Sequence, residues 1–120
     1  MPLASLALLC APVVAIDGDT LKDCAGRRWR LARIDAPELH GCRKGRICAP
    51  GDAVASKRAL AGMIEGAKVR CRIVDASPDR PGFQAQGPYG RPVVRCWANG
   101  RELGPAMIAG GWAVKWPIRR

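Results

Sequence analysis

Short runs of apolar and β-branched residues alternate along the chain with pairs of turn-forming residues, which is the pattern of short strands. The first run, PVVAID at 12–17, ends at Asp17-Gly18, a pair that favours a turn. The run 28–35 is stopped by Ala36-Pro37, because proline cannot continue a strand ladder. Further strands are predicted at 21–24, 68–75, 92–98 and 112–116.

One longer segment, 53–65, has the spacing of a helix. Asp52 suits its N-cap and Gly66 lies just past its end, as helix boundaries prefer. A second, short helix is predicted at 104–108, where Gly104-Pro105 suits a helix start. The apolar stripe of the longer helix is expected at Val54, Leu60, Ala61 and Ile64.

This order of elements predicts a small α+β domain or a helix-capped barrel. We place the domain at 12–118 and a separate apolar segment at 1–11. The apolar segment resembles part of a secretory signal, although it lacks a positively charged start, and it could instead lead directly into the first strand. No apolar run reaches the roughly 18–20 residues of a membrane-spanning helix, so no stable membrane association is expected.

The charge of the chain changes this picture from a generic domain to one with a polyanionic partner. Its 120 residues carry 20 Lys and Arg against 10 Asp and Glu, a formal charge of +10. Five of the ten acids nevertheless lie within 17–38, where they would repel a polyanion. Turn residues and surface ion pairs could explain that cluster, and so could a cation bound between acid and substrate.

Six cysteines, an even number without a CxxC pair, indicate disulfides from an oxidising compartment more than a zinc site. Cys42 and Cys48 bracket a basic loop and could close it. Cys71 and Cys96 lie in two strand-like runs and could be bridged if those strands are neighbours, and Cys10 with Cys24 is a third possible pair. Six cysteines allow fifteen connectivities, and the sequence alone does not choose among them. Buried free thiols remain the alternative.

Four short motifs carry residues that suit phosphoryl chemistry, namely DGDT at 17–20, Arg30, DAPE at 35–38 and YGR at 89–91. Carboxylates and main-chain carbonyls are the ligands of a hard divalent cation, and a carboxylate near that cation can accept a proton from water. Two arginines can bind phosphate oxygens with their planar forks. Arg30 and Asp35 are about 16 Å apart on a straight strand, so a shared site requires a strong bend between them.

The chain resembles the staphylococcal nuclease-like (thermonuclease) family over residues 12–116. The matching segments are VVAIDGDTL, WRLARIDAPEL, the helix at 53–65, YGR with the strand after it, and ELGPAMIAGGWA. The resemblance implies an OB-type five-stranded β-barrel with packed helices, and the chain stops where the family has its final C-terminal helix, so that helix is expected to be missing.

The resemblance also implies an activity, the calcium-dependent cleavage of phosphodiester bonds in DNA and RNA to give 3′-phosphates. Its metal ligands would be Asp19, Asp35 and the carbonyl of Ala36, with Ca²⁺ as the cofactor. Glu38 would be the general base. The residues implied to contact substrate are Arg30, Arg91 and Tyr89, of which the two arginines would also act in catalysis.

Two other function classes remain open on the sequence. The chain could be an OB-fold module that binds nucleic acid without cleaving it, or a disulfide-rich, adhesin-like domain that meets polyanions by charge alone. We expect a monomer that is secreted or periplasmic, or cytoplasmic if the N-terminal segment is not a signal.

Overall fold

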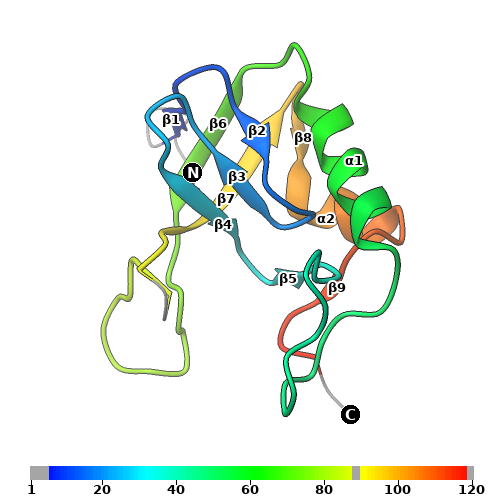
Figure 1. Cartoon of the computed structure of the whole chain (residues 1–120). Helices are drawn as coiled ribbons and strands as arrows, with labels where there is room; N and C mark the ends of the chain where they lie inside the picture. Colours follow the sequence, from blue (N-terminus) through cyan, green and yellow to red (C-terminus); the bar gives the residue numbers. More distant parts are fainter. Residues whose placement is uncertain (1–5, 88–89, 119–120) are drawn as a thin grey trace.

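The computed structural model describes residues 6–87 and 90–118, which form an α+β fold with one mixed sheet, a separate strand pair and two helices (Figure 1). The main sheet has the order β1-β6-β7-β4-β3-β2, with β8 paired to β7, and β5 pairs with β9. The strands are β1 (Ala7–Leu8), β2 (Val14–Ala15), β3 (Thr20–Lys22), β4 (Arg28–Leu31), β5 (Ile34–Asp35), β6 (Val69–Ile73), β7 (Val93–Ala98), β8 (Arg101–Glu102) and β9 (Val114–Lys115). The helices are α1 (Ala53–Ile64) and α2 (Leu103–Ala109).

The pairing of β4 with β7 is parallel and lies in the middle of the sheet, whereas the other strand pairs are antiparallel. The register places Arg30 opposite Val93, and the main-chain N–H of Arg30 donates to the carbonyl of Pro92 at 2.9 Å. This pairing brings the start of β7, just after Arg91, against β4. Two segments some sixty residues apart in sequence therefore meet at one end of the sheet.

The expectation of a closed five-stranded barrel is wrong for this chain, because the sheet is open. Closure would require one continuous strand that pairs with both β6 and β3, whereas here β1 pairs with β6, with Ala7 opposite Cys71, and β2 pairs with β3. β1 and β2 are consecutive in the chain and stand at the two ends of the strand order. Pro12, which lacks a main-chain N–H, lies between them and helps to interrupt what would otherwise be one strand.

The run 28–35 is also not one strand as predicted, but two strands separated by a turn. Arg33 has φ 64°, a left-handed conformation that non-glycine residues seldom adopt and that cannot continue a strand. β5 consequently leaves the main sheet and pairs with β9, Asp35 opposite Val114. The strong bend that a shared site of Arg30 and Asp35 requires is thus present.

Helix α1 begins where its capping residue predicts. The Asp52 side chain accepts hydrogen bonds from the main-chain N–H groups of Val54 and Ala55 at 3.0 and 3.1 Å. The predicted apolar stripe is only half right. Leu60 and Ile64 are buried, but Val54 and Ala61 are exposed, and the third buried position is Ser56.

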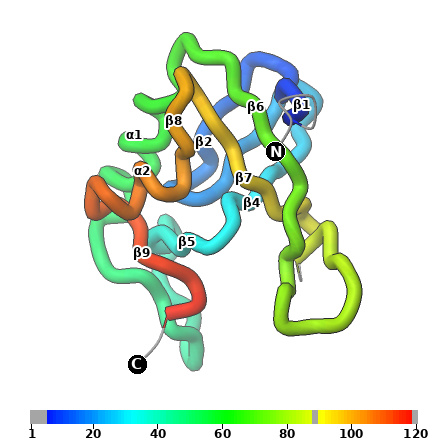
Figure 2. Tube along the Cα trace, turned by 180° about the vertical axis from the view of Figure 1, so that it is seen from behind, coloured from blue at the N-terminus to red at the C-terminus, as the bar shows by residue number. Residues whose placement is uncertain are grey.

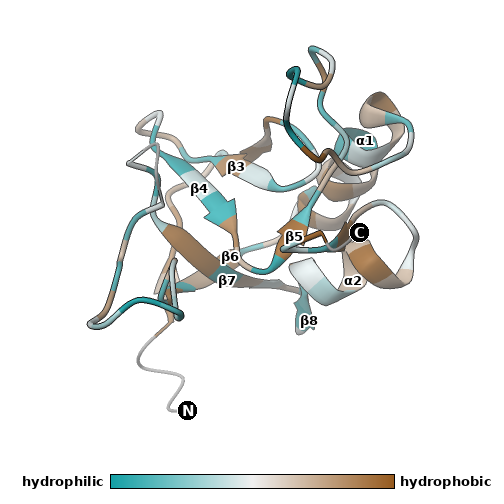
Figure 3. Cartoon of the chain, turned by 90° about the horizontal axis from the view of Figure 1, so that it is seen from below, coloured by the Kyte–Doolittle hydropathy of each residue, from teal (hydrophilic) through white to brown (hydrophobic). Residues whose placement is uncertain are grey.

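Both helices pack at one end of the sheet, and the hydrophobic core lies between them and the strands (Figures 1 and 2). In the view from below, β7 presents mainly hydrophobic residues whereas much of β4 is hydrophilic (Figure 3). The most deeply buried apolar side chains of the core are Leu21, Leu31, Ile34, Leu60, Leu103, Met107, Val69 and Val94. β4 thus supplies one core residue, Leu31, next to charged ones.

All three disulfides suggested by the sequence are present, linking Cys10 to Cys24, Cys42 to Cys48, and Cys71 to Cys96. Cys71 and Cys96 face each other across β6 and β7, and both are buried in the core. Disulfides of this kind fit an oxidising, extracellular environment. Among the helices described, neither is long and apolar enough to cross a membrane.

We expect the loss of the Cys71–Cys96 bridge to destabilise the fold far more than the loss of Cys42–Cys48. The first bridge closes 25 residues within the core and the second closes 6 residues of an exposed loop. The Cys71→Ala/Cys96→Ala variant should lose about 3–4 kcal/mol of unfolding free energy in urea denaturation, and Cys42→Ser/Cys48→Ser about 1–2 kcal/mol. Equal losses would contradict this ranking.

Candidate active site

Asp19 lies in the turn between β2 and β3, yet its side chain is buried, because the turn packs against α1. The main-chain N–H of Asp19 donates to Asp17 Oδ1 at 3.0 Å, which fixes the turn locally. A Cβ atom added at Gly18 would lie 1.9 Å from Ser56 Oγ, so only glycine permits this close approach. Ser56 Oγ in turn donates to the carbonyl of Trp112 at 2.7 Å.

Arg30 bridges the two most deeply buried carboxylates of the chain. Its Nη1 lies 3.4 Å from Asp19 Oδ2 and its Nη2 lies 3.7 Å from Asp35 Oδ1. Nη1 also donates to the carbonyl of Leu31 at 2.9 Å. The side chains of Asp19 and Asp35 are only 9% and 3% exposed, so Arg30 is the countercharge that makes their burial tolerable.

Arg91 is linked to one of these two carboxylates, that of Asp19, through a hydroxyl group. Its Nη1 donates to Thr20 Oγ1 at 3.3 Å, and that hydroxyl donates to Asp19 Oδ1 at 2.9 Å. Thr20 is fully buried in β3, so its hydroxyl group is held in place between the Arg91 guanidinium and the Asp19 carboxylate. Thr20 was not singled out from the sequence, although it belongs to the DGDT motif.

Glu38 joins the cluster through Arg46, a residue of the disulfide-closed loop. Arg46 Nη1 lies 2.9 Å from Glu38 Oε1, and Arg46 Nη2 lies 3.8 Å from Asp35 Oδ1. In the sequence, Arg46 is one of the residues of the basic loop between Cys42 and Cys48, and no motif marks it. Its place in the site depends on the path of the loop, and the one signal that could have found it is the pair of cysteines on either side.

Ala36 is the remaining member of the predicted metal set, and its main chain lies against Asp19. The N–H of Ala36 donates to Asp19 Oδ2 at 2.9 Å, and the residue is buried. Asp35 Oδ1 is buried and has no hydrogen-bond partner, an arrangement that a cation would satisfy. Within the described part of the chain no three Asp, Glu, His or Cys side chains form a metal cage, so main-chain carbonyls and water would have to complete the coordination. A hard cation bound by oxygen fits these residues.

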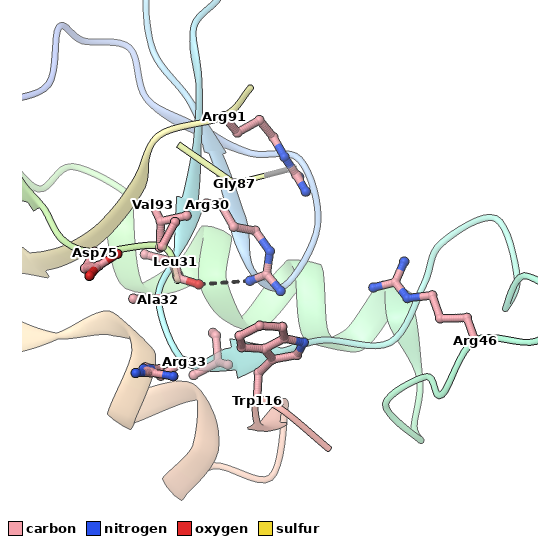
Figure 4. Close-up of a pocket in the computed structure, with 12 residues that line it drawn as sticks. Arg30, Leu31, Ala32, Arg33, Arg46, Asp75, Gly87, Arg91, Val93 and Trp116 are labelled. Atoms are coloured by element: carbon pink, nitrogen blue, oxygen red, sulfur yellow. Dashed lines mark hydrogen bonds between the residues drawn. The ribbon is translucent and has the colours of Figure 1, made fainter. Parts of the chain in front are cut away.

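A pocket of about 150 Å³ opens beside this acidic cluster (Figure 4). Arg30, Arg91 and Arg46 line it, with Arg46 approaching from its own loop. The indole of Trp116, 44% exposed, lies at the same pocket and offers a flat apolar surface beside the cations. The main-chain N–H of Trp116 donates to the carbonyl of Arg33 at 2.9 Å, which holds it near the β4–β5 turn.

The acidic residues of the site differ in their readiness to ionise. Burial, followed by interaction with Asp19, raises the pKa of Asp17 to about 6. Burial also acts against the ionised form of Asp19, but the charge of Arg30 and several hydrogen bonds outweigh it and lower its pKa. For Asp35, burial and then the negative charge of Asp19 raise the pKa, against the opposing effect of Arg30 and Arg46.

The structure therefore brings together six of the seven predicted site residues, Asp19, Arg30, Asp35, Ala36, Glu38 and Arg91. The seventh, Tyr89, lies outside the described residues. The chain matches no protein-family model, and a search of curated proteins likewise finds no match.

Neutralising Asp17 should stabilise the metal-free protein in a pH-dependent way. Its pKa is about 6 in the folded state and 3.8 when unperturbed, so the folded state holds more protons between these values. Stability due to this group is therefore present below about pH 4 and is lost as the pH rises to about 6. We expect Asp17→Asn to gain about 1–3 kcal/mol at pH 7 and nothing at pH 3.5, measured by urea denaturation with a chelator.

Asp79→Asn, which neutralises an exposed acid, is the control for this measurement. A gain for Asp17→Asn that does not change with pH would contradict the assignment.

Proposed function

We propose that this chain is a calcium-dependent, sugar-nonspecific nuclease that hydrolyses phosphodiester bonds of DNA and RNA to 3′-phosphate products. The observation that carries the proposal is the convergence of Arg30 and Arg91 on one pocket beside the carboxylates of Asp19 and Asp35. A basic pocket alone would bind any anion. Here the basic pocket lies beside buried acids, and one of their oxygens, Asp35 Oδ1, has no hydrogen-bond partner. This combination favours a phosphate that binds together with a cation.

The resemblance to the staphylococcal nuclease-like family supports the same proposal and assigns the roles. Asp19, Asp35 and the carbonyl of Ala36 would hold the calcium ion. When bound, that ion would stabilise negative charge on the phosphate oxygens. Tyr89, which belongs to the YGR motif, would contact the nucleotide.

The strand order also suits the OB-type topology that this family implies. β2, β3, β4, β7 and β6 follow one another across the sheet, with the parallel β4–β7 pair at the centre. We interpret β1 and β2 as two parts of one first strand, since β1 pairs with β6 and β2 pairs with β3. On this interpretation the sheet is an OB-type barrel opened at the interruption between residues 8 and 14.

The chain's own residues divide the reaction between them. Glu38, at the edge of the cluster and about one-third exposed, can accept a proton from a water molecule that attacks phosphorus. Arg30 and Arg91 bind the non-bridging oxygens, and their charge matters most when phosphorus is five-coordinate. The bond to the 5′-oxygen then breaks, and the phosphate stays on the 3′-oxygen.

Calcium-dependent digestion is the first test. The wild type should cleave fluorescent DNA and RNA oligonucleotides with Ca²⁺ and stop when a chelator is added. Glu38→Gln should lose about 10²–10⁴-fold in rate, because the amide cannot accept the proton, and should still bind single-stranded DNA. Glu65→Gln, at the exposed end of α1, is the matched control and should cleave normally.

Cleavage that continues without divalent cations would overturn the calcium mechanism. Salt-dependent binding without cleavage by the wild type would favour the alternative, a non-catalytic OB-fold module that binds nucleic acid.

The shape of the arginine group, beyond its charge, should matter at the pocket. Arg91→Lys keeps the positive charge but loses the planar fork that can hold two phosphate oxygens. We expect the single-turnover rate constant of cleavage to fall about 10²-fold or more. Arg101→Lys in β8, an exposed position outside the pocket, should leave the rate unchanged. Equal rates for Arg91→Lys and the wild type would exclude Arg91 from transition-state binding.

A further inference from the structure

The loop closed by Cys42 and Cys48 carries one cation, Arg46, into the acidic cluster. A turn at its tip is fixed by the main-chain N–H of Arg46, which donates to the carbonyl of Arg43 at 3.1 Å. The carbonyl of Arg46 lies 3.4 Å from Cys42 Sγ, a packing contact, since a bridged sulfur has no proton to donate. The disulfide therefore lies directly against the backbone that presents the Arg46 side chain.

Arg30 and Arg46 face the same oxygen, Asp35 Oδ1, at 3.7 and 3.8 Å. Neither arginine makes a hydrogen bond to it, and the oxygen is left unsatisfied in the interior. Two positive groups thus neutralise this carboxylate from a distance. Such an arrangement leaves the oxygen available to a ligand that can approach more closely.

The two arginines differ in their freedom to move. The Arg30 side chain is 16% exposed and is held by the carbonyl of Leu31, whereas the Arg46 side chain is 41% exposed and extends from a surface loop. A cation bound at Asp35 would repel both guanidinium groups. Only Arg46 can respond by rotating away, and the pocket it already lines contains the two arginines proposed to bind phosphate.

We propose that Arg46 is an exchangeable counter-ion, which neutralises Asp35 and Glu38 in the metal-free protein and turns to a substrate phosphate when a divalent cation binds. This inference rests on the proposed function and adds a third phosphate-binding arginine to it. The exchange replaces the single positive charge of Arg46 by the two charges of the cation, so the three carboxylates stay compensated after Arg46 leaves. It also frees the Glu38 carboxylate, which Arg46 holds at 2.9 Å, when both ligands are present.

The exchange predicts effects of opposite sign on two ligands. Arg46→Gln removes a competitor of the cation, so it should bind Ca²⁺ about threefold to tenfold more tightly in isothermal titration calorimetry without nucleotide. With Ca²⁺ present, the same variant should bind a nucleoside 3′,5′-bisphosphate about tenfold to a hundredfold more weakly. This probe contains only monoester phosphates, so a phosphodiesterase would not consume it.

Lys44→Gln is the matched control, because it removes one positive charge from the same exposed loop without an ion pair to the acidic cluster. It should change either affinity by less than about twofold. Cys42→Ser/Cys48→Ser should shift both affinities in the same directions as Arg46→Gln, because an open loop presents Arg46 less often.

Several outcomes would overturn the exchange. They are equal effects of Arg46→Gln and Lys44→Gln, unchanged Ca²⁺ affinity in Arg46→Gln, an open-loop variant that behaves as the wild type, and a wild type that binds no Ca²⁺. Cleavage assays separate this inference from the proposed function. If Arg46→Gln shows the opposed binding effects but the wild type does not cleave, the nuclease proposal is refuted and the exchange is supported. If the wild type cleaves normally but Arg46→Gln lacks those effects, the exchange is refuted and the nuclease proposal is supported.

Discussion

The ion pairs that Arg30 makes with two buried carboxylates are the interaction on which this end of the molecule depends. Charged groups are buried only when they are paired, because removing them from water otherwise costs several kcal/mol each. Asp19 comes from the turn before β3 and Asp35 from β5, and both carboxylates lie close to one guanidinium group. If that group were lost, two like charges would be left close together in the interior. Arg30 is therefore needed both for the stability of this end of the fold and for the geometry of the site.

The position of Arg30 is itself a consequence of the sheet. β4 lies between β3, which follows Asp19, and β7, which follows Arg91. The parallel pairing of β4 and β7 places Arg30 opposite Val93, and the turn after Leu31 then brings Asp35 back toward Arg30. Three short strands therefore bring the acids and arginines together, although each contributes only a few residues. The disulfides stabilise the same framework, with Cys71–Cys96 crossing β6 and β7 in the core.

Local signals in the sequence predict much of this fold, and contacts between distant segments account for what they miss. The Asp52 cap, the turn at Asp17-Gly18 and the cysteine pairs are short-range features, and the structure contains all of them. The open sheet was not predictable, because it depends on where the chain is interrupted between β1, which pairs with β6, and β2, which pairs with β3. Val54 was wrongly placed in the core because spacing alone cannot show which side of a helix meets the sheet.

The candidate site shows the same division. The predicted acids and arginines meet, because the motifs that carry them lie at the ends of short strands. Arg46 has no motif of its own, and its contact with Glu38 depends on how a loop of seven intervening positions folds back. The order of residues thus indicates the chemistry of the site, while loop geometry decides which additional cation reaches it.

The left-handed backbone at Arg33 gives the site an evolutionary constraint. At the other non-glycine residue of this kind among those described, Asn99, the chain uses a residue type that tolerates the conformation well. An arginine pays roughly 1 kcal/mol or more there relative to glycine. Selection for thermal resistance alone would favour glycine or asparagine at position 33 and would remove a cation from the pocket rim. At position 33, thermal stability therefore favours glycine or asparagine, whereas attraction of anions to the pocket favours arginine.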